Sequence, residues 1–354
     1  MLITFLIHYE GMSEIKNILP LKKTPITSYA HLANYISILW TSEKSLSWFS
    51  DHYIQIVANA DAKYDWFTFY DALVTNNIFS YQYCPFSEQF RIDRRDVENN
   101  LGFECFTDMI EHYIDKGFYI QSALNQFYLK CSENFKKYDN IHPAFIYGYN
   151  NTTKEIYIAD FYNSKYSHQT VSYDEINDSY SQFPFKSDAP KWFYATSFIK
   201  YNDYNYEINR DLLKLSINDY LHSRDSFNKY RYSFNYYDKK MYYGLDCYNL
   251  LIEHCENARE QLDIRPFHLL YDHKTAMKIR LNYLNQKNII STKSFEIISA
   301  QCDELLNMTL ILRNLVLKYN VTLSKSSLEK IIVSCQDLKE YDLRFTEALL
   351  ESID

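Results

Sequence analysis

The chain has 354 residues, a length that suits two medium domains or one domain with a large appendage. Hydrophobic residues make up 47% of it, and only 5 Gly and 7 Pro are present, so a collagen-like, linker-like or disordered chain is excluded. The net charge of −8, without any basic run, argues against nucleic acid and an anionic membrane surface as partners.

The cysteines and the apolar segments indicate the cellular compartment of the protein. Its seven cysteines are scattered and none has CxxC spacing, which favours buried free thiols in a reducing compartment over a zinc or disulfide framework. Residues 1–9 are apolar but lack a basic n-region, so we interpret them as a first strand and not a signal peptide. No stretch reaches the roughly 18 apolar residues of a membrane span. We expect a soluble, cytoplasmic protein.

The first half of the chain alternates short apolar runs with turn-rich pieces. Apolar residues at i, i+3, i+4 spacing predict a helix over residues 29–40, with Thr27 and Ser28 at its start, where a cap belongs. A second helix is predicted over 107–116 and a strand over 118–124. Gly117, between them, is a natural stop for the helix.

The clearest hairpin follows. Its strands are His142–Tyr149 and Glu155–Asp160, joined by a polar turn over 150–154. Ser172 with Glu175 predicts a capping box at the start of a short helix. A further strand, over residues 191–199, closes this half.

The second half shows helical spacing throughout, and the junction lies near residue 203. We predict a domain over residues 1–203 and a helical domain over 204–354, hence an α+β fold. The expected helices cover residues 208–223, 246–261, 267–285, 293–319 and 326–350.

His142 and Asp160 are the candidate chemical pair of the hairpin. Nucleophilic acyl transfer needs a nucleophile at a helix N-terminus, a His within hydrogen-bond reach, and a third polar group that orients the imidazole. A five-residue loop would pair Gly148 with Lys154 and put His142 directly opposite Asp160 on one face. A slip of one residue would turn one of the two away. The alternative is that His142 merely begins a strand and Asp160 merely ends one.

Four phrases of the sequence together resemble one protein family. They are His142–Tyr149 with Glu155–Asp160, Gly117–Leu129, Tyr243–Tyr248 and Arg265–His273. They look like papain-fold, C39-peptidase-like proteins, above all the BtrH-type acyltransferases of butirosin and related nonribosomal peptide clusters. Within this group, the chain also resembles the papain-like transacylases of closthioamide-type assembly. The resemblance spans about Leu19 to Tyr283. It implies a papain-like fold, a helix packed on an antiparallel sheet, followed by a helical domain.

The resemblance also implies a catalytic triad. In the family a Cys-Tyr phrase opens the first helix, and the matching phrase here is Ser28-Tyr29. Ser28 would be the nucleophile, His142 the base and Asp160 the orienting acid. Three interpretations of Ser28 stay open: a true hydroxyl nucleophile, the relic of a lost site, or an engineered replacement of Cys. An ordinary N-cap serine is the plainer alternative.

Real cysteines compete with residue 28 for the role of nucleophile. Cys247 lies in a Cys-Tyr phrase but follows His142 in the chain, against the papain order. Cys84 and Cys105 keep that order, and Cys105 is the better of the two because a helical run begins just after it. We interpret all three mainly as core thiols. No HExxH, GxGxxG or P-loop spacing is present, so neither metal nor cofactor is expected.

The expected activity is amide-forming acyl transfer in natural-product biosynthesis. The resemblance implies an acyl group held as a thioester on the phosphopantetheine of a carrier protein, and a small amine as acceptor. Carrier proteins are acidic, so docking would need a basic patch, for which the candidates are Lys191, Lys200, Lys239, Lys240, Arg265, Lys274 and Arg280. A peptidase-like or thioesterase-like hydrolase and a degenerate binding or scaffold protein of the same fold are the alternatives.

Overall fold

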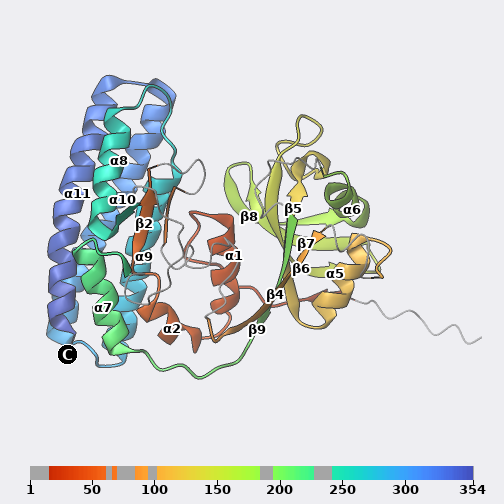
Figure 1. Cartoon of the computed structure of the whole chain (residues 1–354), viewed down its shortest axis with the longest axis horizontal. Helices are drawn as coiled ribbons and strands as arrows, with labels where there is room; N and C mark the ends of the chain where they lie inside the picture. The colour runs from red at the N-terminus through yellow and green to blue at the C-terminus, as the bar shows by residue number, and fades with distance from the viewer. Residues whose placement is uncertain are drawn as a thin grey trace, which may run out of the picture. The chain divides into compact units, whose positions relative to one another are not determined.

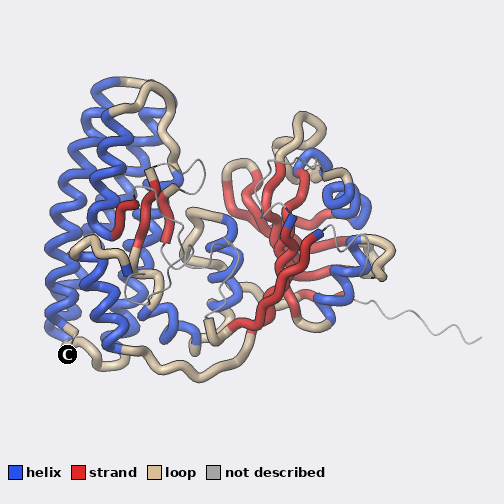
Figure 2. Tube along the Cα trace, viewed as in Figure 1, coloured by secondary structure: helices blue, strands red, loops and turns tan. Residues whose placement is uncertain are grey.

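The computed structural model describes residues 16–60, 66–69, 84–94, 102–183, 194–226 and 241–353. It confirms the α+β class (Figures 1 and 2). The chain divides into two compact units: Met1–Pro20 with Gln89–Lys200, and Leu21–Glu88 with Tyr201–Asp354. The break near residue 200 lies close to the expected junction, but residues 21–88 group with the C-terminal half. The strand expected over residues 1–9 lies outside the described residues.

The first unit is built on a seven-stranded sheet. Its strand order is β4-β9-β5-β6-β7-β8, and β1 pairs with β6 beside that path. The strands are β1 (Lys16–Ile18), β4 (Ser87–Asp93), β5 (Phe118–Asn125), β6 (Ile141–Asn150), β7 (Glu155–Tyr162), β8 (Lys165–Ser172) and β9 (Ala195–Tyr201). The pairs of β6 with β1, β5 and β7 are antiparallel, as are β5 with β9 and β7 with β8.

The central strand β6 has two neighbours along one edge. β5 pairs with its first half, from Ile141 to Ile146, and β1 pairs with Gly148–Asn150. At Gly148 the β1 backbone comes so close that a Cβ atom would lie 2.7 Å from the Asn17 carbonyl oxygen. Only glycine therefore fits at this point of β6.

The β6–β7 hairpin exists as predicted, but its register was predicted wrongly. Asn150 pairs with Glu155, and Gly148 pairs with Tyr157 and not with Lys154. The register then shifts by one residue between Ile146 and Gly148, so that Phe145 pairs with Ala159. Tyr147 is thus the extra residue of a β-bulge, which no local feature of the sequence had indicated.

Two helices cover one face of this sheet, α5 (Phe106–Asp115) and α6 (Tyr173–Ser181) (Figure 1). The buried core between them and the sheet includes Met109, Ile110, Ile146, Ile158 and Ile176. The predicted capping box of Ser172 and Glu175 is confirmed at the start of α6. Gly117, with φ of +82°, follows the end of α5 as expected.

The second unit is mainly helical. Its helices are α1 (Ala30–Leu39), α2 (Ser45–Asp51), α7 (Arg210–Leu221), α8 (Cys247–Glu256), α9 (Arg265–Gln286), α10 (Thr292–Thr322) and α11 (Lys325–Ser352). The five helices expected in the C-terminal half are confirmed, and α9, α10 and α11 lie side by side (Figure 2). A small sheet was missed: β10 (Met241–Tyr243) pairs with β2 (Ile56–Asn59), and β2 pairs with β3 (Phe67–Phe69).

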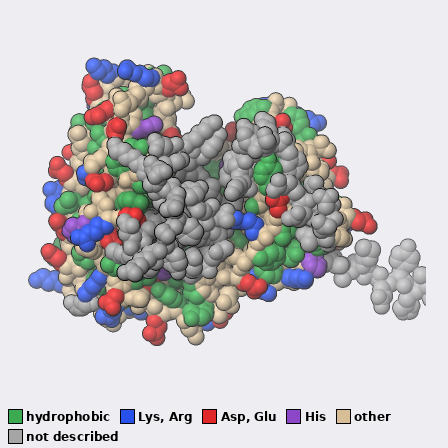
Figure 3. Space-filling model, in the orientation of Figure 1, with side chains coloured by type: hydrophobic (Ala, Val, Ile, Leu, Met, Phe, Trp, Pro, Cys, Tyr) green, Lys and Arg blue, Asp and Glu red, His purple; other side chains and the backbone are tan. Residues whose placement is uncertain are grey.

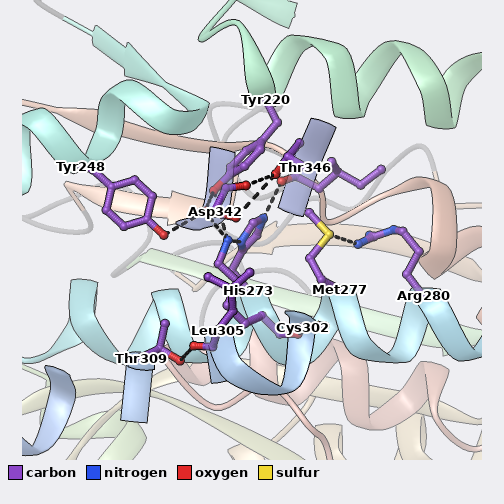
Figure 4. Close-up of polar contacts among 12 residues, drawn as sticks. Tyr220, Tyr248, His273, Met277, Arg280, Cys302, Leu305, Thr309, Asp342 and Thr346 are labelled. Atoms are coloured by element: carbon purple, nitrogen blue, oxygen red, sulfur yellow. Dashed lines mark hydrogen bonds and ion pairs between the residues drawn. The ribbon is translucent and has the colours of Figure 1, made fainter. Parts of the chain in front are cut away.

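A buried ion pair connects four helices of this unit (Figure 4). Lys274 Nζ of α9 donates to Asp342 Oδ2 of α11 at 2.5 Å, and both side chains are fully buried. Tyr220 of α7 and Tyr248 of α8 donate their hydroxyls to the same carboxylate oxygen. Burial lowers the pKa of Lys274, and Asp342 acts in the opposite direction. One carboxylate therefore joins four helices.

Arg280 and Lys274 were predicted wrongly as parts of a docking patch, because both are fully buried. Arg280 donates to the carbonyl oxygens of Ser50, His52 and Tyr53, at the C-terminal end of α2. A cation at that end complements the helix dipole. Lys191, Lys239 and Lys240 lie outside the described residues, and Arg265 forms an ion pair with Asp263.

The outer surface of the described residues carries both signs of charge. On the face shown in Figure 3, Lys and Arg side chains alternate with Asp and Glu. Among the helices of the described ranges, none is both long and apolar enough to cross a membrane.

Replacing Asp342 by Asn should destabilise the protein far more than removing one of its neutral donors. The Lys274 ammonium would stay buried without its counter-charge, which costs about 3–5 kcal/mol. Tyr248→Phe, the matched control, removes only one hydrogen bond to a charged acceptor, at about 1–3 kcal/mol. Urea unfolding of both variants measures the difference, and equal losses would contradict a stabilising role for the charge pair.

Candidate functional site

His142 and Asp160 are brought together in the first unit. The imidazole Nδ1 lies 2.7 Å from Asp160 Oδ2 and 2.6 Å from Oδ1. The Asp160 side chain is 1% exposed, whereas the His142 side chain is 34% exposed. A buried carboxylate thus holds an imidazole that solvent and small molecules can reach.

Because of the β-bulge at Tyr147, the side chains of His142 and Asp160 point to the same face of the sheet. In the register next to the turn, His142 and Asp160 would point to opposite faces of the sheet, because the side-chain period of a strand is two. The one-residue shift brings Phe145 opposite Ala159, which puts Ala144 opposite Asp160. His142 is then the diagonal neighbour of Asp160 on the same face, two residues from the directly opposite position that we expected.

The bonding of Asp160 fixes which nitrogen of His142 carries the proton. Asp160 Oδ1 accepts the backbone N–H of Phe161 at 2.7 Å, and Oδ2 accepts from Gln126 Nε2 at 3.2 Å. Since the carboxylate only accepts, Nδ1 of His142 must donate to it, and the lone pair of the neutral ring is on Nε2. This is the tautomer that a general base needs.

Ser28, the third predicted residue, lies in the second unit, just before α1. The expectation that Ser28 or Thr27 caps this helix was wrong: the N-cap position is Tyr29, and its side chain makes no capping bond. Ser28 is 5% exposed, and its Oγ has no hydrogen-bond partner among the described residues. The approach of Ser28 to His142 and Asp160 stays a prediction.

Asp272 of α9 binds the backbone of the two residues that precede the N-cap of α1. Its Oδ2 accepts the backbone N–H groups of Thr27 at 2.7 Å and Ser28 at 2.6 Å. Burial raises the pKa of the Asp272 carboxyl to about 7, while these two amide donors act against the rise. Asp272 belongs to the phrase Arg265–His273, whose resemblance to the family gave this residue no role.

The contact with Asp272 changes what the Ser28 amide can do. In a papain-like site the N–H of the nucleophile residue would donate to the oxyanion of the tetrahedral intermediate. In this chain that N–H already donates to a carboxyl group. As long as it donates to Asp272, the Ser28 N–H is not available as an oxyanion donor.

His268 is a second imidazole beside the start of α1, but its bonding does not suit a base. Arg313 donates to His268 Nδ1 at 3.1 Å, so Nδ1 must be the acceptor. The proton of the neutral ring is then on Nε2, which lies 2.9 Å from Thr27 Oγ1 and donates to it. Burial and Arg313 together lower the pKa of His268 to about 4. His268 therefore holds Thr27 and cannot take its proton.

Two of the three rival cysteines fit the core role that we expected, whereas Cys105 does not. Cys84 and Cys247 are buried, and burial raises the pKa of the Cys84 thiol to about 12 and that of Cys247 well above its ordinary value. A protonated thiol is a poor nucleophile. Cys105 is partly exposed and occupies the N-cap of α5, with Sγ 3.0 Å from Thr107 Oγ1.

Comparison with protein-family models and with curated proteins adds no relative. No family model matches the chain, and a search of curated proteins finds no match. Within the described ranges, no three His, Cys, Asp or Glu side chains gather in a way that could hold a metal ion.

Asp272→Asn should change how stability depends on pH. The ordinary pKa of the carboxyl is 3.8 and the folded one about 7, so between these values the native state binds the extra proton. As pH rises from about 4 to 7, ionisation of the Asp272 carboxyl therefore lowers the folding stability of wild type. The variant has no carboxyl at position 272 and lacks that loss. The stability of Asp272→Asn relative to wild type should grow from pH 5 to pH 8 in urea unfolding.

His268 also makes stability depend on pH, because its pKa is lowered to about 4 in the folded protein. It titrates in the unfolded state of both proteins, so its contribution cancels when the two stabilities are subtracted. Parallel pH curves would show that Asp272 is already ionised in the folded protein at pH 5, which contradicts a raised pKa for its carboxyl.

Proposed function

We propose that the chain is an acyltransferase of papain-like fold that moves an acyl group from a carrier-protein thioester to an amine, through an acyl-enzyme on residue 28. The observation that carries the proposal is the His142–Asp160 pair: a buried carboxylate, 2.6–2.7 Å from Nδ1 of a partly exposed imidazole. Such a pair is what nucleophilic catalysis requires of its base and its orienting acid.

The first half of the reaction forms the acyl-enzyme. Ser28 Oγ bonds to the thioester carbonyl carbon, and His142 Nε2 takes the hydroxyl proton. The carbon–sulfur bond then breaks, and the imidazolium returns the proton to the leaving thiol of the phosphopantetheine arm. Asp160 keeps the ring oriented and stabilises its charged form throughout.

The second half releases the amide. The amine nitrogen bonds to the ester carbonyl carbon while His142 takes one of its protons. The bond to Ser28 Oγ breaks, and the proton returns to that oxygen. A hydrolase would share the acyl-enzyme and differ only in using water at this step.

The second candidate function is a binding or scaffold protein of the same fold. One observation favours it: Ser28 is buried, and its amide is already engaged by Asp272. A hydroxyl is also much harder to ionise than the thiol that the family uses. If residue 28 is a relic, the His142–Asp160 pair would persist without a nucleophile.

Incubation with an acyl-loaded carrier protein, followed by intact-mass measurement, tests the proposal. Wild type should gain one acyl group slowly, Ser28→Cys should gain it faster, and Ser28→Ala should gain none. His142→Ala in the Ser28→Cys background should slow acylation by about 10²–10⁴-fold, as the loss of a general base does. His222→Ala is the matched control and should not change the rate of acylation. His222 lies at the end of α7, where its ring is hydrogen-bonded to the Asn218 carbonyl oxygen.

The absence of an adduct on both the wild type and Ser28→Cys would reject acyl transfer at residue 28. Tight binding of the carrier without any adduct would instead favour the scaffold function. An adduct that is lost equally fast with and without added amine would identify a hydrolase.

A further inference from the structure

A buried glutamine lies directly behind the His142–Asp160 pair. Gln126 opens the short 3₁₀ helix η1 (Gln126–Tyr128) that follows β5, and it is 3% exposed. Gln126 follows the last residue of β5, and in that strand Leu124 pairs with His142. No motif of the sequence had pointed to Gln126.

The nitrogen end of the Gln126 amide faces Asp160. Gln126 Nε2 lies 3.2 Å from Asp160 Oδ2 and 3.4 Å from the Phe161 carbonyl oxygen. Both of these atoms only accept hydrogen bonds, so the group that faces them must be the NH₂ and the orientation of the amide is settled by its partners.

The oxygen end of the same amide gathers three donors. Gln126 Oε1 accepts from Ser132 Oγ at 3.1 Å, Asn134 Nδ2 at 2.9 Å and Asn140 Nδ2 at 2.8 Å. All three belong to the segment between η1 and β6, and the backbone N–H of Gln126 donates to the Asn140 carbonyl oxygen at 2.8 Å. One side chain thus connects this segment to the carboxylate that holds His142.

We propose that Gln126 is a positioning residue for the His142–Asp160 pair. It holds the Asp160 carboxylate so that both of its oxygens face Nδ1 of His142. In the described part of the chain, the hydrogen-bond donors to Asp160 are His142, Gln126 and the amide of Phe161, so the buried charge relies on oriented neutral dipoles. The contribution of Gln126 to acyl transfer rests on the proposed function, whereas its effect on His142 does not.

Replacing Gln126 by Glu should disturb the pair with almost no change in volume. The new carboxyl would lie next to the buried Asp160 carboxylate, where two negative charges cannot both be accommodated without cost. The proton that they share would compete with Nδ1 of His142 for Asp160. Gln126→Met, which removes the donor and adds no charge, should act in the same direction more weakly.

Gln121→Glu is the matched control. Gln121 is a glutamine of the preceding strand β5, is also 3% exposed, and pairs with Phe145, so it lies on the other face of the sheet from Asp160. A general cost of burying a carboxyl should therefore appear in both Glu variants, and a specific effect on His142 only in Gln126→Glu.

Nitrogen-15 NMR of the histidine rings measures the effect directly. Wild type and Gln121→Glu should show the His142 ring with its proton on Nδ1. Gln126→Glu should shift this ring toward a mixture of tautomers, and Gln126→Met should do so in part. In the acylation assay, kcat should fall about 10-fold to 100-fold in Gln126→Glu with KM little changed, as misplacement of a catalytic group predicts.

Unchanged His142 ring signals in both Gln126 variants would overturn the proposal. If the signals change but no form of the protein, including Ser28→Cys, takes up an acyl group, then Gln126 positions the pair and the proposed function fails. If the signals stay unchanged while the enzyme is active, the proposed function stands and the positioning role fails.

Discussion

The hydrogen bond between His142 and the buried Asp160 carboxylate depends on a single extra residue in β6. Without the bulge at Tyr147, the two side chains would leave opposite faces of the sheet, and Asp160 would be a buried anion without its imidazole. The surrounding groups reinforce this arrangement, since Gln126 and the amide of Phe161 both donate to Asp160. The bulge is therefore the constraint on which the candidate chemistry rests.

Asp342 and Arg280 of the second unit are buried charges to which no chemistry is assigned, and each is paired. The Asp342 carboxylate accepts from Lys274 and two tyrosines, and Arg280 is bound by backbone carbonyl oxygens at the end of α2. Such pairing is what structural charges require. Asp272 is different, because its Oδ2 accepts from two backbone amides and burial raises the pKa of its carboxyl to about 7.

The sequence predicted much of the fold and part of the site. The helices of the C-terminal half and the β6–β7 hairpin were predictable because their apolar spacing is local. His142 and Asp160 were rightly predicted to share a face, although the register used to argue this was wrong, since a bulge leaves no mark in a run of β-forming residues. Asp272 and Gln126 were missed because their partners lie 244 and 34 residues away.

The central claim is that residue 28 and His142 work on the same acyl group, and a bifunctional alkylating reagent tests it most directly. 1,3-Dibromoacetone first alkylates a reactive thiol and then an imidazole within its short reach. In the Ser28→Cys variant, peptide mapping should find residue 28 linked to His142, and Asp272→Asn should not abolish the link. Alkylation of residue 28 without a link to His142, under conditions where the fold is intact, would contradict the claim.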